Sequence, residues 1–527
     1  MTKRRKKEPA PADAKKPDAK KPKQATPEAT PEERATARAF VALLVVSGAL
    51  LAVRWWAARA IGFGDSEALY ACWAKHPQAA YLDHPGLVGL LAGAMGDERG
   101  ATPMSVHSIT AIFATVFPWL FVLVARRVLG ASRERALLTG LVVAVVPEIA
   151  IGLYALTPDL PLAFAELAAL GAAYAATNEA PRSTRAAGLF ALTGLMCGVA
   201  GASKVSGLLL FVGLAVAFAK GRHARTPWPW LGLAAGLAPM VPVVRHELAH
   251  GFPMLRHRLV DTQAGAGPSL RNLGALVGGQ LAYVSPVLLA IAVALAVDLW
   301  RRRNDDDGAR VLAWATFVPL AALAALTLVS RVAEPHWLAP AWLPLPLWAA
   351  RRAASDDRPR LLGPRWVAGG ATLAAVLVAA VHAWVLVPGA SKLAPKGSDP
   401  KLDISNELFG WREVASALDD VGVADPGTVV VGPHWVICAQ LHAALEGVRV
   451  GCDTPIRDDF DDWLPRDEWR AADRVVWVTD ARFPSEPEKL LPELHLAGVQ
   501  HVTTIRAGRA IRHFTITTLE RRARAAL

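Results

Sequence analysis

Apolar segments alternate with short polar connections between residues 39 and 388. A helix needs about 20 mostly apolar residues to cross a bilayer. By that measure we place about eleven spans, several of them short: 39–56, 105–124, 136–153, 161–177, 187–200, 205–219, 227–244, 272–299, 311–330, 338–350 and 366–388. The pattern predicts a polytopic α-helical membrane protein.

Basic residues cluster between alternate spans. Positively charged loops stay on the cytoplasmic side of a membrane, so these clusters orient the chain. They are Arg126, Arg127, Arg133 and Arg135; Arg182 and Arg185; Lys220, Arg222 and Arg225; Arg301 to Arg303; and Arg351 to Arg365. The N-terminus is therefore expected in the cytoplasm, and everything after residue 388 on the outer side.

The two ends of the chain differ from its apolar middle, residues 39–390. Residues 1–38 are low-complexity and rich in Lys, Pro, Ala and Glu; we expect a disordered basic cytoplasmic tail, because such a segment cannot bury enough apolar surface to fold. Residues 391–527 alternate helical and strand patterns, which predicts a small extracytoplasmic α/β domain. Its expected elements are helices 411–419 and 435–445 and strands 428–431, 448–450, 474–478, 502–505 and 511–516.

The composition agrees with a membrane protein. Apolar residues make up 53% of the 527 residues, which is too many for an ordinary soluble enzyme. The net charge of +11 is spread over short inter-span clusters. No basic groove is implied, so we expect no nucleic-acid partner.

Polar residues gather in loops that the charge pattern places on the outer side. The first loop carries Asp65, Glu67, Tyr70, Asp83 and His84, and later segments carry Asp159, Lys204, Arg256, Arg258, Glu334, His336 and Trp337. Each group also has an ordinary explanation: a solvated loop, a helix cap, a lysine reaching the interface, or proline at a helix end.

The order of these motifs resembles the C-type glycosyltransferases of the protein-mannosyltransferase and aminoarabinose-transferase superfamily. The first outer loop of that superfamily is similar to Asp65-x-Glu67-Ala-x-Tyr70 followed by Tyr81-x-Asp83-His84-Pro85. Further similar motifs follow in unbroken order to about residue 345: Thr157-Pro-Asp159, Ser203-Lys204, Gly279-Gln280, Ser285-Pro286 and Pro335-x-Trp337.

This resemblance implies a membrane enzyme that moves a sugar from a polyprenyl-phosphate donor to an envelope acceptor, which is a lipid, a glycan or a protein. It implies the periplasmic face of the bacterial inner membrane as the place of reaction. Asp65 would be the general base, with Glu67 and Asp159 orienting the acceptor. Lys204, Arg256, Arg258 and His336 would meet the donor phosphate, and Tyr70, Asp83, His84, Gln280, Glu334 and Trp337 would complete the substrate site.

A divalent metal is a further expectation of this kind. Asp65, Glu67 and Asp159 would be its ligands, although their spacing specifies no particular ion.

Two positions depart from the superfamily pattern. Its members usually have adjacent Asp and Glu in the first loop, whereas Ser66 separates Asp65 from Glu67 here. His107 stands where an arginine is commoner. Two alternatives to a transferase therefore stay open: a catalytically inactive, acceptor-binding homologue and a lipid or polysaccharide transporter.

Two of the four cysteines lie close together in the predicted outer domain. Cys438 falls in the helix after strand 428–431, and Cys452 ends the next strand. A short helix-to-strand connection can bring their Cα atoms within the roughly 4.4 to 6.8 Å that a disulfide needs. We expect a Cys438–Cys452 bridge, with two unpaired core cysteines as the alternative.

Overall fold

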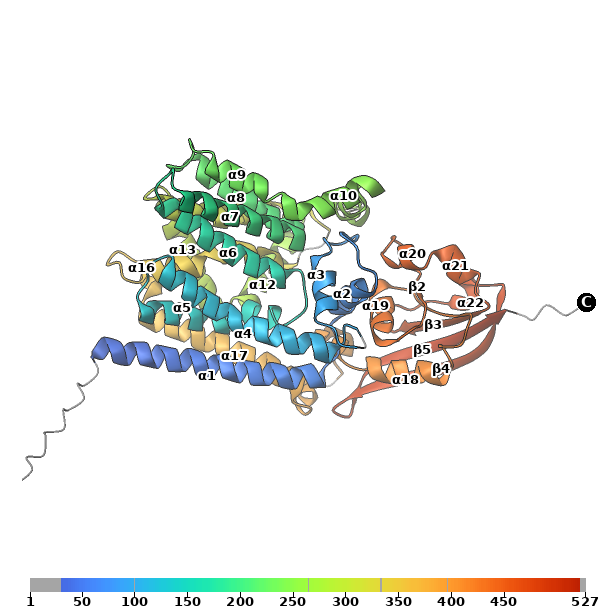
Figure 1. The fold of residues 1–527 in the computed structure, drawn as a ribbon. Helices are drawn as coiled ribbons and strands as arrows, with labels where there is room; N and C mark the ends of the chain where they lie inside the picture. Colours follow the sequence, from blue (N-terminus) through green and yellow to red (C-terminus); the bar gives the residue numbers. More distant parts are fainter. Residues whose placement is uncertain (1–29, 99, 264, 332–333, 396, 522–527) are drawn as a thin grey trace, which may run out of the picture.

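The computed structural model describes residues 30–98, 100–263, 265–331, 334–395 and 397–521. A layered bundle of helices occupies one end of the molecule, and a sheet-containing domain occupies the other (Figure 1). Two short helices, α2 (Asp65–Lys75) and α3 (Leu87–Ala94), lie between them.

Among the described residues, six helices are long and apolar enough to cross a membrane. They are α1 (Pro31–Ala60), α4 (Pro103–Arg127), α6 (Asp159–Asn178), α7 (Thr184–Ser203), α14 (Asp307–Val329) and α17 (Pro364–Leu386). Shorter helices complete the bundle: α5 (Arg133–Val145), α8 (Leu208–Ala219), α9 (Trp228–Ala235), α10 (Val241–His250), α11 (Pro253–Leu259), α12 (Leu270–Tyr283), α13 (Pro286–Arg301), α15 (Ala339–Trp342) and α16 (Pro344–Arg352). The predicted number of eleven spans is not confirmed.

The predicted span 272–299 is broken in the structure. Helices α12 and α13 meet at an angle of 109°, and they raise the number of spans to seven if they are counted as one. Ser285 at the break has a positive φ of 76°, which is strained for a residue other than glycine. Pro286 starts α13, where its missing N–H costs nothing. The apolar pattern runs through this break, so the sequence reads as one helix.

Helix α1 begins before the first predicted span. Thr30 caps it: the Thr30 hydroxyl accepts a hydrogen bond from the Glu33 amide, and the Glu33 carboxylate accepts one from the Thr30 amide. This reciprocal cap, with Pro31 in the first turn, starts the helix eight positions earlier than the apolar pattern does. Residues 31–38, expected in the disordered tail, are therefore helical, and residues 1–29 of that tail lie outside the described residues.

Small residues bring α7 and α9 close together. A Cβ atom built on Gly194 would lie 1.7 Å from the Gly232 carbonyl oxygen, and one on Gly198 would lie 1.9 Å from that of Gly236. Only glycine fits such an approach, and spacing of four residues places both contacts on one face of α7.

The C-terminal domain is a five-stranded sheet with helices, as the alternating pattern predicts. Its strands, in the order β2-β1-β3-β5-β4, are β1 (Thr428–Gly432), β2 (Val450–Cys452), β3 (Arg474–Asp480), β4 (Leu494–Arg506) and β5 (Arg509–Arg521). β1 pairs in parallel with β2 and β3, and β5 pairs antiparallel with β3 and β4. The helices are α18 (Trp411–Asp420), α19 (Trp435–Ala444), α20 (Phe460–Trp463), α21 (Arg466–Arg470) and α22 (Pro487–Leu490).

A disulfide joins Cys438 of α19 to Cys452 at the end of β2, with the Cα atoms 5.9 Å apart. This is the pair expected from the sequence. Cys72 and Cys197 are buried free thiols.

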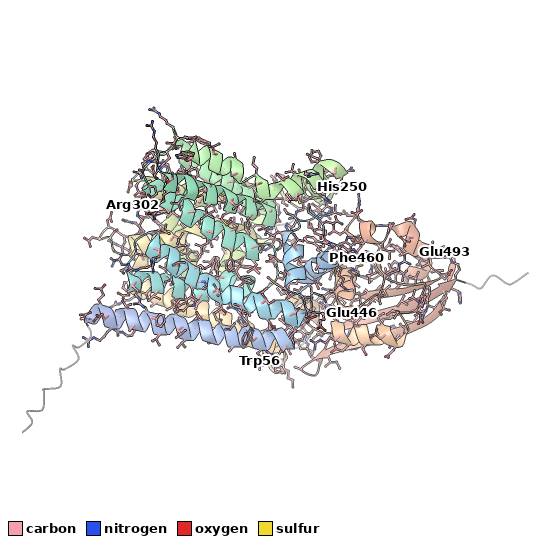
Figure 2. The ribbon with its side chains drawn as sticks, in the orientation of Figure 1. Trp56, His250, Arg302, Glu446, Phe460 and Glu493 are labelled. Carbon is pink, nitrogen blue, oxygen red and sulfur yellow. A yellow bond between two sulfur atoms is a disulfide. The ribbon has the colours of Figure 1, made fainter. Side chains whose placement is uncertain are left out.

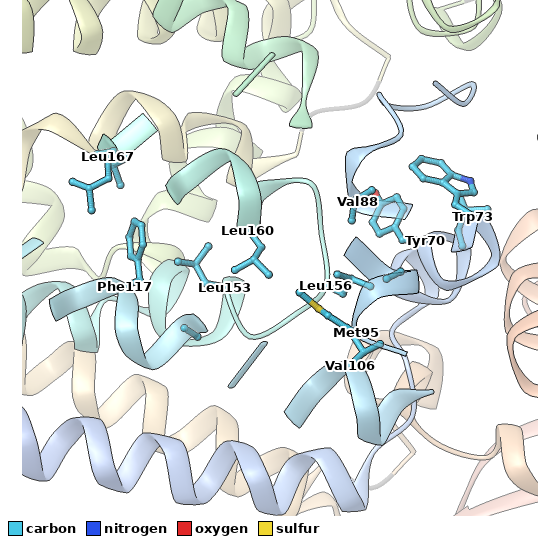
Figure 3. Packing of buried hydrophobic residues seen from close by; sticks show 14 of the residues in the cluster. Tyr70, Trp73, Val88, Met95, Val106, Phe117, Leu153, Leu156, Leu160 and Leu167 are labelled. Carbon is cyan, nitrogen blue, oxygen red and sulfur yellow. The ribbon is translucent and has the colours of Figure 1, made fainter. Parts of the chain in front are cut away.

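One apolar core connects α2 and α3 with the helical bundle. Figure 3 shows its side chains running from the short helices into the bundle: Tyr70, Trp73, Val88, Met95, Val106, Leu156, Leu153, Leu160, Phe117 and Leu167. The same core extends into α19 through buried Ile437 and Leu441. Helix α2, which carries Asp65 and Glu67 where the sequence predicts a loop, is therefore packed between the two parts of the molecule.

Candidate active site

Asp159 and Lys204 form a close ion pair at the ends of two long helices. Asp159 is the first residue of α6, and Lys204 directly follows α7. The Lys204 Nζ lies 2.9 Å from both carboxylate oxygens of Asp159, and the lysine side chain is only 9% exposed. An ammonium group has three N–H donors, so one remains for a further acceptor.

Neutral imidazoles and a second cation surround this pair. The His336 Nε2 lies 3.9 Å from Asp159 Oδ2. Burial and the charge of Lys204 lower the pKa of His336 to about 4. Burial, with the charges of Lys204 and Arg258, holds the pKa of His84 well below its usual range. Both rings are therefore uncharged at neutral pH and available as hydrogen-bonding groups.

Helix α11, which follows α10, contributes Arg258 to the same region. Its Nη1 donates to Asp83 Oδ1 at 3.1 Å, and the His257 Nε2 lies 3.8 Å from that oxygen. The Tyr70 ring lies 6.2 Å from the His84 ring. Burial, with the negative charges of Asp83 and Asp159, raises the pKa of the Tyr70 phenol. Arg256 points elsewhere: its side chain is 73% exposed and lies 3.6 Å from Asp261.

An apolar cavity of about 360 Å³ has Asp159 in its lining. Helices α5, α6, α13 and α16 supply half of its lining residues, and the basic residues in the lining are Arg135 on α5 and Arg358. Two further carboxyls line it: Glu166, seven residues after Asp159 on α6, and Glu148 on the π-helical turn Glu148–Gly152. Seven helical residues rise about 10 Å, so Glu166 lies well inside the cavity along α6. Glu166 is thus an ionisable residue inside the predicted span 161–177.

Asp65 faces the C-terminal domain. Its Oδ1 accepts from Gln440 Nε2 of α19 at 3.1 Å, and its Oδ2 lies 3.0 Å from Arg482 Nη1. The Arg482 Nε donates in turn to the fully buried Asp480 at 2.8 Å. Two elements of the C-terminal domain thus fix the orientation of the candidate base.

Glu67 turns into the helical part of the molecule. Its carboxylate accepts hydrogen bonds from His107 Nε2 at 3.0 Å, the Leu156 amide at 2.7 Å and the Gly64 amide at 2.9 Å. Burial alone would raise the pKa of Glu67, but these partners, His107 first, lower it below its usual value. The unusual histidine at position 107 is therefore the partner of Glu67. Through its three hydrogen bonds, Glu67 connects α2 to α4 and to the turn before α6.

Asp65 and Glu67 point apart because they lie on one helix. Residues two apart on an α-helix are about 200° apart around its axis. Within the described part of the chain, no three His, Cys, Asp or Glu side chains are close enough together to hold a metal ion. The expected ligand set of Asp65, Glu67 and Asp159 is not assembled, since each carboxylate has a different protein partner.

Gln280 organises the turn that contains His336. Its Nε2 donates to the Pro335 carbonyl at 2.7 Å, and its Oε1 accepts from Trp342 Nε1 at 2.9 Å. The Glu334 Oε2 lies 4.0 Å from the His336 Nδ1. Trp337 is half-buried in the same short helix, Pro335–Leu338. Gln280 therefore positions the turn that carries His336.

The C-terminal domain is attached to α2 and to the loop that follows it by several polar contacts, of which those of Asp459 are buried. Asp459 accepts from Trp73 Nε1 at 2.9 Å and from the Leu82 amide at 3.0 Å. Lys75 Nζ donates to the His442 carbonyl at 2.5 Å, and the rings of His76 and His442 stack 5.3 Å apart. Burial raises the pKa of Asp459 to about 7.

Comparisons with known proteins agree with this architecture. Residues 83–246 match the family model described as dolichyl-phosphate-mannose-protein mannosyltransferase. The fold is similar to the crystal structure of ArnT from Cupriavidus metallidurans bound to undecaprenyl phosphate, with a TM-score of 0.54, 15% identity, and coverage of 90% of this chain and 97% of that one. The apo state of the same protein gives a TM-score of 0.56 at 14% identity with the same coverage. No curated protein matches the sequence.

These matches confirm the resemblance to C-type glycosyltransferases of the mannosyltransferase and aminoarabinose-transferase superfamily. The chain is a multi-pass membrane protein of that fold with a small C-terminal sheet domain.

Sequence reasoning missed the residues that surround Asp65. Gln440, Asp480 and Arg482 lie more than 370 positions from it and match no local motif. Glu166 did carry a signal, since a single carboxyl in an apolar span is costly unless it serves a site.

Proposed function

We propose that this protein is a membrane glycosyltransferase that moves a sugar from a polyprenyl-phosphate donor to an envelope lipid, glycan or protein. The observation that carries the proposal is the apolar cavity of about 360 Å³ whose lining includes Asp159, the ion-pair partner of Lys204. A polyprenyl phosphate combines a long apolar chain with an anionic head, which suits an apolar cavity next to a cation. Undecaprenyl phosphate is the ligand bound to the similar ArnT structure.

In the proposed reaction, the acceptor oxygen or nitrogen bonds to the anomeric carbon while the bond from that carbon to the donor phosphate oxygen breaks. The acceptor proton passes to Asp65, and the electron pair of the broken bond stays on the phosphate. Lys204, Arg258 and His336 are the phosphate-side groups, because preorganised donors stabilise charge that develops in the transition state. Asp65 can accept the proton because a carboxylate offers about four lone-pair sites and its protein partners use two.

The proposed location is the bacterial inner membrane, with the N-terminus in the cytoplasm and the C-terminal domain in the periplasm. The basic clusters support this orientation. Arg302, from one of them, lies at the end of the helical bundle that is remote from the C-terminal domain, and Phe460 and Glu493 mark that domain (Figure 2). Reporter fusions after Gly397 should report a periplasmic position, and fusions after Arg303 a cytoplasmic one. A cytoplasmic signal after Gly397 would refute the orientation.

The decisive test is sugar transfer by the purified protein from a radiolabelled polyprenyl-phosphate sugar to an envelope extract. We expect Asp65→Asn to lower the rate by about 10²-fold or more while donor binding persists, because a general base contributes roughly that factor. Asp425→Asn, an exposed carboxyl of the C-terminal domain, is the control and should leave the rate unchanged. If Asp65→Asn stays active, the base is another group.

One observation favours the second candidate, an inactive acceptor-binding homologue. Both oxygens of Asp65 already accept hydrogen bonds from the C-terminal domain. Binding of the donor without transfer to any envelope fraction would support this candidate over the transferase. Movement of intact lipid across vesicles would instead support a transporter.

A further inference from the structure

A second cavity lies where the C-terminal domain meets the segment that leads to it from α17. Its volume is about 190 Å³. Residues 399–407 form one wall, and the end of β3 with the two residues after it and the first part of β5 form the others. This junction cavity is separate from the apolar cavity, since the two share no lining residue.

Two arginines of the junction cavity have guanidinium nitrogens without partners. Arg512 is 8% exposed, and its buried Nη1 has no hydrogen-bond partner among the described residues. The buried Nη2 of Arg482 has none either. Leaving a buried charged donor unsatisfied is costly, so such atoms indicate a missing acceptor.

The carboxylates around these arginines do not supply that acceptor. Asp65 and Asp480 both bind Arg482 through its Nη1 and Nε atoms. Asp403 accepts hydrogen bonds from Trp384 and Ser405, and Asp399 accepts one from the Lys401 amide. Burial and the charge of Asp65 raise the pKa of Glu407 to about 7, so this carboxyl is partly protonated at neutral pH. The Arg512 guanidinium carbon lies 5.1 Å from the centre of the Trp411 ring. The ring covers one face of the guanidinium but accepts no hydrogen bond from the N–H groups in the guanidinium plane.

We propose that the junction cavity binds an oxyanion, a phosphate or carboxylate group, through Arg512 and Arg482. Planar guanidinium groups recognise both oxyanions through paired N–H donors, which a lysine does not provide. The anion would lie beside Arg482, whose Nη1 contacts Asp65 at 3.0 Å.

The position of this site suggests what carries the anion. If Asp65 is the general base, an anion bound to the neighbouring Arg482 is part of the acceptor molecule. Binding of this anionic group would place the acceptor's nucleophilic atom next to Asp65. This assignment to the acceptor rests on the proposed function. Binding of the anion itself does not, because it depends only on the two arginines and the cavity.

The affinity of the junction cavity for an anion should fall as Glu407 ionises. Below pH 7 Glu407 is mostly neutral and leaves Arg512 for the ligand, whereas above pH 7 its carboxylate becomes a competing counter-charge. The other charged or titratable groups that face the cavity, contact Arg482 or act on Glu407 are Asp65, Glu67, Asp399, Lys401, Asp403, Asp480 and His513. Acetate is the probe for this dependence, since its charge is constant between pH 6 and 8.

The experiment titrates the detergent-solubilised full-length protein with inorganic phosphate and with acetate at constant ionic strength, with chloride as the reference, by calorimetry. We expect saturable binding of phosphate, of acetate or of both, and the stronger ligand identifies the acceptor group. Arg512→Gln should weaken binding by about tenfold or more, because it removes a charge-assisted hydrogen bond. Arg449→Gln, on the distant strand edge, should bind as the native protein does.

Two results would overturn the proposal. One is the absence of saturable binding of either anion to the native protein, a result that does not depend on any variant folding. The other is equal affinity in Arg512→Gln and the native protein. If the native protein binds the anion but transfers no sugar, the proposed function is refuted and the anion site is not.

Discussion

Replacing Lys204 by glutamine separates a phosphate-binding role from a purely structural one. In the structure Lys204 Nζ lies 2.9 Å from both oxygens of Asp159, and both side chains are largely buried, at 9% and 18% exposure. Removing one partner of a buried ion pair typically costs 3 to 5 kcal/mol. Because Asp159 borders a cavity and keeps some exposure, we expect the lower end, about 3 kcal/mol.

The effect on the donor is a separate quantity. Among the described residues, Lys204 Nζ contacts only the two oxygens of Asp159, which leaves its third N–H for a phosphate oxygen. A hydrogen bond to a charged group contributes about 1.5 to 3 kcal/mol. Lys204→Gln should therefore lower kcat/KM for the polyprenyl-phosphate sugar by roughly 10- to 100-fold.

Asp159→Asn provides the discriminating comparison. It should lower stability in the same way, yet leave donor affinity equal or higher, because Lys204 loses its competing carboxylate. Lys392→Gln, an exposed lysine, is the matched control. Initial rates and thermal unfolding in detergent measure the two effects. If folded Lys204→Gln keeps native kcat/KM, the lysine has only a structural role and our reasoning fails.

Three further predictions follow from other contacts. Glu67→Gln and His107→Ala should each lower the unfolding free energy by about 3 kcal/mol, and the double variant by less than the sum, since they break one buried pair; additive losses in thermal unfolding would contradict the pairing. Peptide mapping without reductant should recover Cys438 linked to Cys452, whereas free alkylation of both would exclude the bridge. The pKa of Glu407 is raised from 4.5 to about 7, so its contribution to stability is complete below pH 4.5 and is lost as the pH rises through 7. Unfolding of Glu407→Gln should lack this decline, which is on the order of 1 to 3 kcal/mol.

The sequence by itself determined the long apolar helices and the order of the strands and main helices in the C-terminal domain. Apolar length marks a helix that can cross a bilayer, and alternating polarity marks a strand, so both features are local. The six long helices and the α/β order of the C-terminal domain follow from them. The sequence also named Asp65, Glu67, Asp159 and Lys204 as polar residues beside the predicted spans.

Only the tertiary structure decided which of these residues meet. Asp159 and Lys204 pair because α6 and α7 bring their ends together, and Glu67 meets His107 because α2 packs on α4. Asp65 finds Arg482 across 417 positions, a contact that depends on how the C-terminal domain sits on α2. The physical reason is that hydrophobic periodicity is written into neighbouring residues, whereas a side chain's partner is fixed by the packing of elements distant in sequence.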